Sequence, residues 1–221
     1  MTPDWPNEPE NFETELDEEL EDQWLAEWDE AERQAVEVLR NALPDHRMQP
    51  PPVDALRDAA EIVRIRLREG GHPLDWVRQA AGLTDAALTR DDEELLIGLA
   101  AATISPREET GLNVEEEALL LSLELADWLG AIISVVRAGA GADASPRALA
   151  AGVRDCPEVI QDSDFDVDDE AHLHAAFWIV ALPWEGLGLT DRDQRLTSLG
   201  EWVLPRALAR AWSGDFDREH G

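Results

Sequence analysis

The side chains most able to take part in catalysis or metal binding lie close together between residues 162 and 174. Six acidic residues at short spacing precede two histidines: Asp162, Asp164, Asp166, Asp168, Asp169 and Glu170, then His172 and His174. Carboxylates at alternate positions are typical of a calcium-binding loop. An EF-hand loop needs glycine at its sixth position and glutamate at its twelfth, where this chain has Val167 and Leu173. We therefore expect no calcium site, and an acidic segment that caps the helix after it.

Neither the histidines nor the single cysteine has the spacing of a metal or catalytic site. His172 and His174 are two residues apart and would face different sides of a helix, unlike the i,i+4 pair that binds zinc. Cys156 has no obvious histidine partner, which favours a small, partly buried side chain over a nucleophile. The chain also lacks the motifs of serine hydrolases, zinc proteases, P-loop proteins and dinucleotide-binding enzymes. The sequence therefore predicts no catalytic residue, no metal ligand and no cofactor.

The charge balance narrows the class of partner. Of the 221 residues, 49 are acidic and 18 are basic, which gives a net charge of -31. Such a surface repels polyanions and attracts basic partners, and nucleic-acid binding begins with the neutralisation of phosphates. All the basic residues are arginine, a bias that we attribute to a GC-rich, bacterial genome. We expect the partner to be a basic protein or protein complex and not nucleic acid.

Cysteine content and hydropathy predict a cytoplasmic protein. A single cysteine excludes an internal disulfide. Residues 1–10 are acidic and contain proline, without the positive start and apolar stretch of a signal peptide. The apolar run at residues 127–136 is shorter than the roughly 20 residues of a membrane helix. We expect no contact with a membrane.

The elements that must position any site begin with a long acidic helix. We expect residues 1–11 to be a disordered acidic leader and residues 12–43 to form an amphipathic helix that ends before Pro44. Its apolar side chains recur every three or four residues: Phe12, Leu16, Leu20, Trp24, Trp28, Ala31, Ala35, Leu39 and Ala42. The opposite face is mainly Asp and Glu, so the stripe must pack either on the body of the chain or in a groove of a partner. Trp24 and Trp28 are therefore candidate partner-binding residues.

The rest of the chain predicts a mainly α fold, a helical bundle with a C-terminal winged-helix-like module that contains one small β-hairpin. Helices are expected over residues 53–69, 73–81, 91–102, 114–123, 125–138, 145–155, 168–184 and 198–212. Short strands are expected at residues 186–190 and 195–197. We divide this part into a helical region, residues 44–114, with a degenerate helix-turn-helix pattern, and a second domain, residues 115–221.

Residues 188–200 carry the pattern behind this module, because they resemble the wing of MarR-like winged helix-turn-helix proteins. Gly188-Leu-Thr is followed by Leu196-Thr-Ser-Leu-Gly200, and in that family a strand closes on "LTxxG" and enters a helix. We expect Thr197 to cap this helix, and Leu196 and Leu199 to pack beneath the hairpin. The resemblance implies a winged-helix module over residues 125–212. It implies a fold and not an activity.

The third helix of this module departs from a DNA-binding pattern. A DNA-binding winged helix would place that helix in the major groove, where side chains must donate to bases and phosphates. Here the helix begins Asp168-Asp169-Glu170, and no arginine follows before Arg192. These three acids are therefore candidate residues for binding a basic partner.

Two further sets of side chains are expected to have structural roles. The later tryptophans fall at helical positions in the apolar pattern and are predicted to lie in the core: Trp178, Trp184, Trp202 and Trp212. The arginines of residues 57–68 are predicted to form a solvated face paired with nearby acids: Arg57, Arg64, Arg66 and Arg68 with Asp58, Glu61 and Glu69.

These observations favour a non-catalytic protein-protein interaction protein, an adaptor or DNA mimic that binds a basic partner through an acidic winged-helix scaffold. The first alternative is a DNA-binding transcriptional regulator that forms a homodimer through its N-terminal helix. The second alternative is a metal-dependent enzyme that uses residues 162–174.

Overall fold

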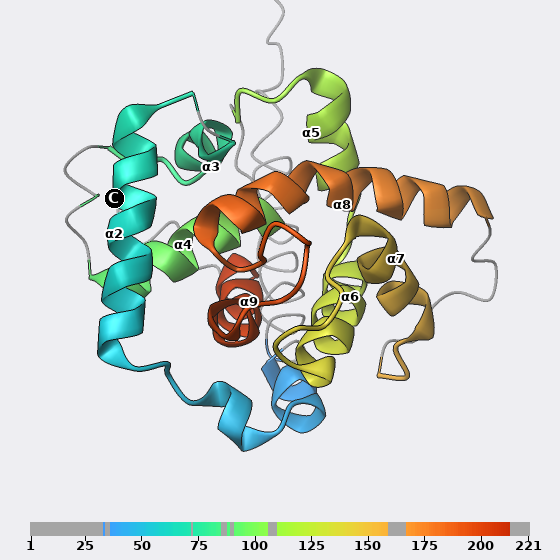
Figure 1. Ribbon diagram of the computed structural model, residues 1–221. Coiled ribbons are helices and arrows are strands. Elements are labelled where there is room, and N and C mark those ends of the chain that lie inside the picture. The colour runs from blue at the N-terminus through green and yellow to red at the C-terminus, as the bar shows by residue number, and fades with distance from the viewer. Residues whose placement is uncertain are drawn as a thin grey trace, which may run out of the picture.

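The computed structural model describes residues 33, 36–71, 73–84, 88, 91–105, 110–158 and 167–212. These residues are mainly helical, as the sequence predicts (Figure 1). In chain order the elements are η1 (Asp45–Met48), α2 (Val53–Glu69), α3 (Leu74–Ala80), α4 (Asp92–Ile104), α5 (Val114–Leu121), α6 (Leu125–Ala138), α7 (Pro146–Asp155), α8 (Val167–Leu187) and α9 (Ser198–Ala211). Before η1, residues 36–42 are helical and end ahead of Pro44, where the sequence places a helix end.

The core forms where α4, α6, α8 and α9 meet. α4 packs on α9, and α6 packs on both α7 and α9. α8 runs across these helices and also contacts α2, α3 and α5 (Figure 1). The rings of Trp128 and Phe177 meet edge to face with 5.4 Å between centroids, and Trp184 lies 6.4 Å from Trp128. All three side chains are fully buried, so this aromatic cluster fixes one side of α8 on α6.

Two glycines let α6 and α7 approach closely. A Cβ atom on Gly130 would lie 2.9 Å from the Cα of Val153, and a Cβ atom on Gly152 would lie 2.9 Å from the Cβ of Ser134. The hydroxyl of Ser134 donates to the carbonyl oxygens of Gly130 (2.7 Å) and Gly152 (3.1 Å), which links the two helices. The crossing therefore depends on the absence of side chains at both glycines.

Two helix starts agree with the capping residues read from the sequence. Ser145 Oγ accepts a 3.3 Å hydrogen bond from the backbone N–H of Ala148, and Pro146 is the first residue of α7. Thr197 Oγ1 accepts from the backbone N–H of Gly200 at 3.0 Å, at the start of α9. The predictions of Ser145 and Thr197 as N-caps are confirmed.

The assignment of residues 186–190 to a strand is wrong at its start, because α8 continues through Pro183 to Leu187. Trp184 and Leu187 are buried, so the helix gains from keeping both in the core. Gly188 then takes φ = 77°, a left-handed conformation that is common at helix ends. The two glycines that the sequence assigns to a strand, Gly186 and Gly188, therefore lie in the last turn of a helix and at its end.

The β-hairpin that the sequence predicts is not confirmed, because its segments form only isolated antiparallel bridges in the described residues. One joins Thr190 to Leu196, and the other joins Asp143 to Arg195. The backbone N–H of Leu196 also donates to the carbonyl oxygen of Ala142 at 2.9 Å. The connection between α6 and α7 therefore lies against Arg195 and Leu196, which lead from the turn into α9. The sequence does not predict this contact.

Within the described part of the chain, no single helix combines the length and apolar composition needed to cross a membrane. α5 and α6 reach that threshold only when taken together, and they are bent by 80° at the break between them. Most of the apolar side chains of α6 are instead buried in the core.

Candidate interaction surface on helix α8

Helix α8 carries exposed side chains on the side that faces away from the aromatic cluster. His174, Trp178 and Leu182 follow one another at intervals of four residues, which places them on one face of the helix. Trp178 is 60% exposed and Leu182 is 58% exposed. The rings of His174 and Trp178 lie 6.3 Å apart. We name these three residues the α8 stripe.

The exposure of Trp178 contradicts the prediction that this side chain lies in the core. Trp184 and Trp202 are buried as predicted, and Trp212 is half-buried. Trp178 differs because α8 is apolar on almost every side, so its sequence does not identify the face that meets the core. The neighbouring Phe177 occupies the core position instead.

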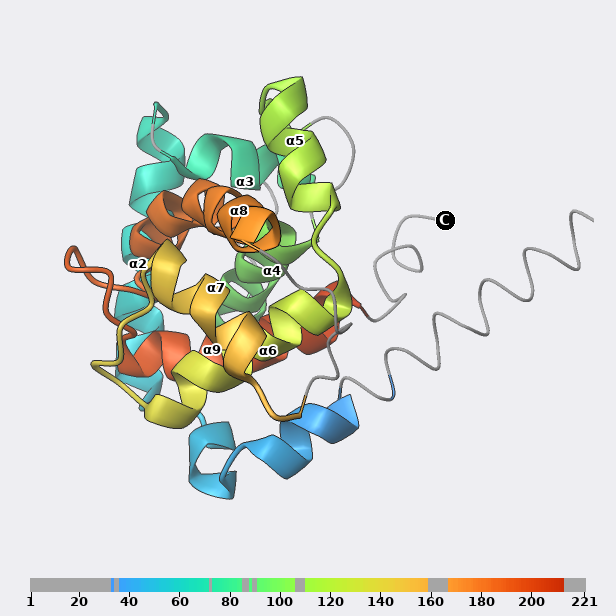
Figure 2. The same cartoon turned by 90° about the vertical axis from the view of Figure 1, so that its right-hand side faces the viewer.

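Neighbouring helices hold α8 along its length. Figure 2, which looks nearly along α8, shows α5 above and α7 below its first turns. Nε2 of His172 lies 2.5 Å from the hydroxyl of Ser122, next to the exposed Leu121 at the end of α5. Near the other end, Arg66 of α2 donates to the carbonyl oxygen of Gly186. The α8 stripe therefore lies on a helix whose position is fixed by its packing.

The predicted acidic contact residues at the start of α8 are described only in part. Glu170 forms a 2.8 Å ion pair with Arg154 of α7, and Arg154 also pairs with Asp155 at 2.9 Å. The hydrogen bond from Arg154 holds the pKa of Asp155 below its ordinary value. Four of the predicted contact side chains lie outside the described part of the structure: Trp24, Trp28, Asp168 and Asp169. Glu170 is the one that is placed, and its charge is paired within the chain.

The environment of Cys156 does not favour nucleophilic chemistry. Its thiol is buried and donates to Oε2 of Glu158 at 3.3 Å. Burial raises the pKa of the Cys156 thiol, and the hydrogen bond from Arg137 holds the pKa of Glu158 below its ordinary value. A buried thiol that keeps its proton is a weak nucleophile.

Metal ligands do not gather in the described residues, where no group of three or more His, Cys, Asp or Glu side chains is arranged to hold an ion. His172 and His174 are both exposed on α8, and the first contacts Ser122. Residues 162–166 of the acidic ladder lie outside the described part of the chain.

The arginine face of α2 is paired with acids at three of its four positions. These ion pairs join Arg57 to Asp54, Arg64 to Asp92 and Arg68 to Glu61. The prediction is therefore right only in part: Glu61 is a partner as expected, but Asp54 and Asp92 are partners in place of Asp58 and Glu69, and the side chain of Arg64 is only 12% exposed. Arg66 differs, because it donates to the carbonyl oxygens of Glu185 (3.5 Å) and Gly186.

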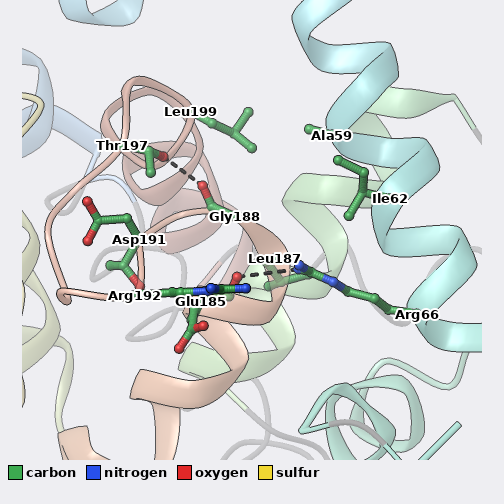
Figure 3. A pocket seen from close by; sticks show the side chains of 11 residues that line it. Ala59, Ile62, Arg66, Glu185, Leu187, Gly188, Asp191, Arg192, Thr197 and Leu199 are labelled. Carbon is green, nitrogen blue, oxygen red and sulfur yellow. Dashed lines mark hydrogen bonds between the residues drawn. The ribbon is translucent and has the colours of Figure 1, made fainter.

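A pocket of about 340 Å³ opens between α2, the end of α8 and the turn before α9 (Figure 3). Ile62, Leu187 and Leu199 supply apolar walls, and Arg66 and Arg192 approach from opposite sides. A smaller depression beside it is lined by Leu182, Glu185 and Arg66, so the pocket adjoins the end of the α8 stripe.

Comparison with protein-family models, curated proteins and solved structures found no match for this chain. The four-residue spacing of the α8 stripe is visible in the sequence, but Phe177 and Trp184 in the same helix have equally apolar surroundings. Only the packing of α8 against its neighbours separates the two faces.

Proposed function

We propose that this chain is a non-catalytic protein-protein interaction protein, and that the α8 stripe contacts its partner. The observation that carries the proposal is the exposure of Trp178 and Leu182 on one face of a well-packed helix. Large apolar side chains that share an exposed patch mark interaction sites, and tryptophan is enriched among residues that dominate binding energy.

A winged-helix scaffold is part of the proposal and is supported by the order of the elements. α6, α7 and α8 are followed by the turn between Thr190 and Leu196 and then by α9, an order that resembles the helix, helix, helix, hairpin, helix order of such modules. The Thr197 cap holds this turn in place, together with the backbone hydrogen bonds that join residues 142–144 to residues 194–196.

A protein partner is favoured over DNA because the outward face of α8 has no cations. The sequence contains no arginine between Arg154 and Arg192, so phosphate contacts from α8 would have no basic donor. The net charge of -31 adds long-range repulsion of nucleic acid and attraction to a basic protein. The proposed partner therefore presents an apolar pocket for Trp178, surrounded by basic residues.

The experiment that tests this function compares the wild-type chain with the double variant Trp178→Ala, Leu182→Ser in a tagged pull-down from native lysate. The partner is then purified, and its Kd for each chain is measured. We expect the double variant to lose about 2 kcal/mol of binding free energy, roughly thirtyfold in Kd, because the exposed tryptophan anchors the contact. Binding of the wild-type chain should also weaken with added salt.

Val53→Ser provides the matched control, since Val53 is 68% exposed at the start of α2 and is not part of the α8 stripe. It should bind the partner like the wild-type chain, and circular dichroism should show that all three chains are equally helical. Equal binding by the double variant, or specific binding of duplex DNA at moderate salt, would contradict the proposed function.

A further inference from the structure

We propose that the pocket between α2 and the turn before α9 binds a small molecule that carries one acidic group on an apolar body. This proposal does not depend on the protein-protein role of the α8 stripe. It rests on the shape of the pocket, on its apolar walls and on two arginines that reach into it (Figure 3).

The apolar walls provide the contact for the body of such a ligand. Ile62 is 50% exposed on α2 and faces the buried Leu187 and the half-buried Leu199 across the pocket. The volume of about 340 Å³ lies within the usual range of roughly 300–1,000 Å³ for small-molecule pockets. A ligand in this position would cover Ile62, which water now contacts.

The two arginines provide the contact for the acidic group. Arg66 is half-buried, and its Nη1 donates to the carbonyl oxygens of Glu185 and Gly186. Neither Arg66 nor Arg192 forms an ion pair with a carboxylate of the described residues, in a chain where acids far outnumber arginines. The remaining N–H groups of Arg66 and the guanidinium of Arg192 are therefore available to an anion, which arginine binds with charge-assisted hydrogen bonds.

The acids of the pocket differ in how they affect an anion. Asp191 Oδ1 accepts hydrogen bonds from the backbone N–H groups of Asp193 and Arg195, both at 2.9 Å, so this carboxylate is engaged in the turn. The carboxylate of Glu185 has no hydrogen bond or ion pair with the described residues and lines the pocket beside the arginines. Glu185 is therefore the charge that opposes an anionic ligand.

The test uses the fluorescent anion 8-anilinonaphthalene-1-sulfonate and its uncharged counterpart N-phenyl-1-naphthylamine, titrated into the full chain. An ionic strength of 0.15 M limits the long-range repulsion from the net charge, because the Debye length is then about 8 Å. We expect the anionic dye to bind at one site, more tightly than the neutral dye.

Removing a positive charge and removing a negative charge from the pocket should change the affinity for the anionic dye in opposite directions. Arg192→Gln should weaken binding of the anionic dye by about tenfold, the effect of losing one charge-assisted contact. Glu185→Gln should strengthen binding of the same dye. Arg195→Gln is the matched control, because Arg195 is in the same turn but donates to the carbonyl oxygen of Gly141 and does not line the pocket.

Three results would overturn the proposal. The first is equal affinity for the two dyes, which would show a purely apolar surface. The second is an unchanged affinity in the Arg192→Gln variant while the folded state, checked by circular dichroism, is retained. The third is loss of dye binding in the Trp178→Ala variant alone, which would place the dye on the α8 stripe.

Discussion

A buried hydrogen bond joins α4 to the aromatic cluster. Nε1 of Trp184 donates to the hydroxyl of Thr103 at 2.9 Å, and that hydroxyl donates to the carbonyl oxygen of Ala100 at 2.7 Å. Both Trp184 and Thr103 are fully buried, so neither has water as a substitute partner. If the acceptor were removed, the indole N–H of Trp184 would stay buried without a partner, and the free energy of unfolding would fall by the desolvation cost of this donor.

We predict that Thr103→Val lowers the free energy of unfolding by about 1–3 kcal/mol, because the indole N–H of Trp184 would then be buried without an acceptor. Urea denaturation followed by tryptophan fluorescence measures this change. Thr103→Ser keeps the hydroxyl and should cost less. A free energy of unfolding in Thr103→Val equal to that of the wild-type chain would show that the hydrogen bond contributes little, because valine keeps the methyl group of threonine and removes only the hydroxyl.

At the scale of elements, the sequence predicts which segments are helical better than it predicts their partners. The bounds of α2 and α6 agree with the apolar periodicity, and α7 begins at the predicted Ser145-Pro146. These signals are local, because a cap or a proline acts on the helix that contains it. Which side of α8 meets the core depends instead on helices far away in the chain, and for that reason the sequence wrongly predicts a core position for Trp178.

The end of α8 also could not be predicted from the local sequence alone. Gly186 and Gly188 are compatible with a strand, a turn or a helix stop when only the local sequence is considered. Burial of Leu187 decides between them, and burial is a property of the assembled fold. The α8 stripe and the pocket beside it could therefore not be located from the sequence, although their residues are all present in segments that it outlines.

The crossing of α6 and α7 gives a prediction at this scale. Gly130→Ala should lower the free energy of unfolding by about 1–3 kcal/mol, because its Cβ would lie 2.9 Å from the backbone of Val153 and force the helices apart. Gly98→Ala is the matched control within α4, where the new Cβ would meet the guanidinium of Arg210 at an ordinary 3.7 Å.

Gly98→Ala should stabilise the chain by about 0.5–1 kcal/mol, since alanine loses less backbone entropy than glycine in a helix. Urea denaturation of both variants separates the two effects by sign. A stabilising Gly130→Ala substitution would show that α6 and α7 can separate at little cost.

At the scale of the whole molecule, the excess of acidic groups acts on every element together. A net charge of -31 destabilises any compact state through self-repulsion, and the repulsion between exposed charges is screened by salt. Ion pairs such as Arg47 with Glu201, at 3.2 Å, relieve this only locally. Added salt should therefore stabilise the folded state by screening the global repulsion and destabilise it by weakening the local ion pairs.

We predict that the Tm at pH 7 rises when NaCl is increased from 0.02 to 0.5 M, because screening of the global repulsion outweighs the loss of exposed ion pairs. Differential scanning calorimetry measures this. At pH 5 the rise should be smaller, since part of the carboxylates are protonated and the net charge is closer to zero. A Tm that falls with salt at pH 7 would show that ion pairs dominate.

In stronger acid, a further fall in pH should lower the Tm. Hydrogen bonds with Ser145 hold the pKa of Asp143 below its ordinary value, as those with Arg154 and Arg137 do for Asp155 and Glu158. A carboxyl whose pKa is lowered by folding stabilises the folded state above its unfolded pKa of about 4, and this contribution is lost as pH falls through the folded pKa. The Tm should therefore pass through a maximum and then decrease below about pH 4.

The packing of α4 on α9 has a consequence for how the chain is made. α4 contains nine buried residues, and α9, against which it packs, is the last helix in the described part of the chain. Although α2, α3 and α8 also contact α4, a ribosome exposes the part of the apolar surface of α4 that α9 covers long before it has synthesised α9. Synthesis is directional, so folding of this core has to wait until Ser198–Ala211 has emerged, and a nascent chain stalled before that point would present α4 to chaperones.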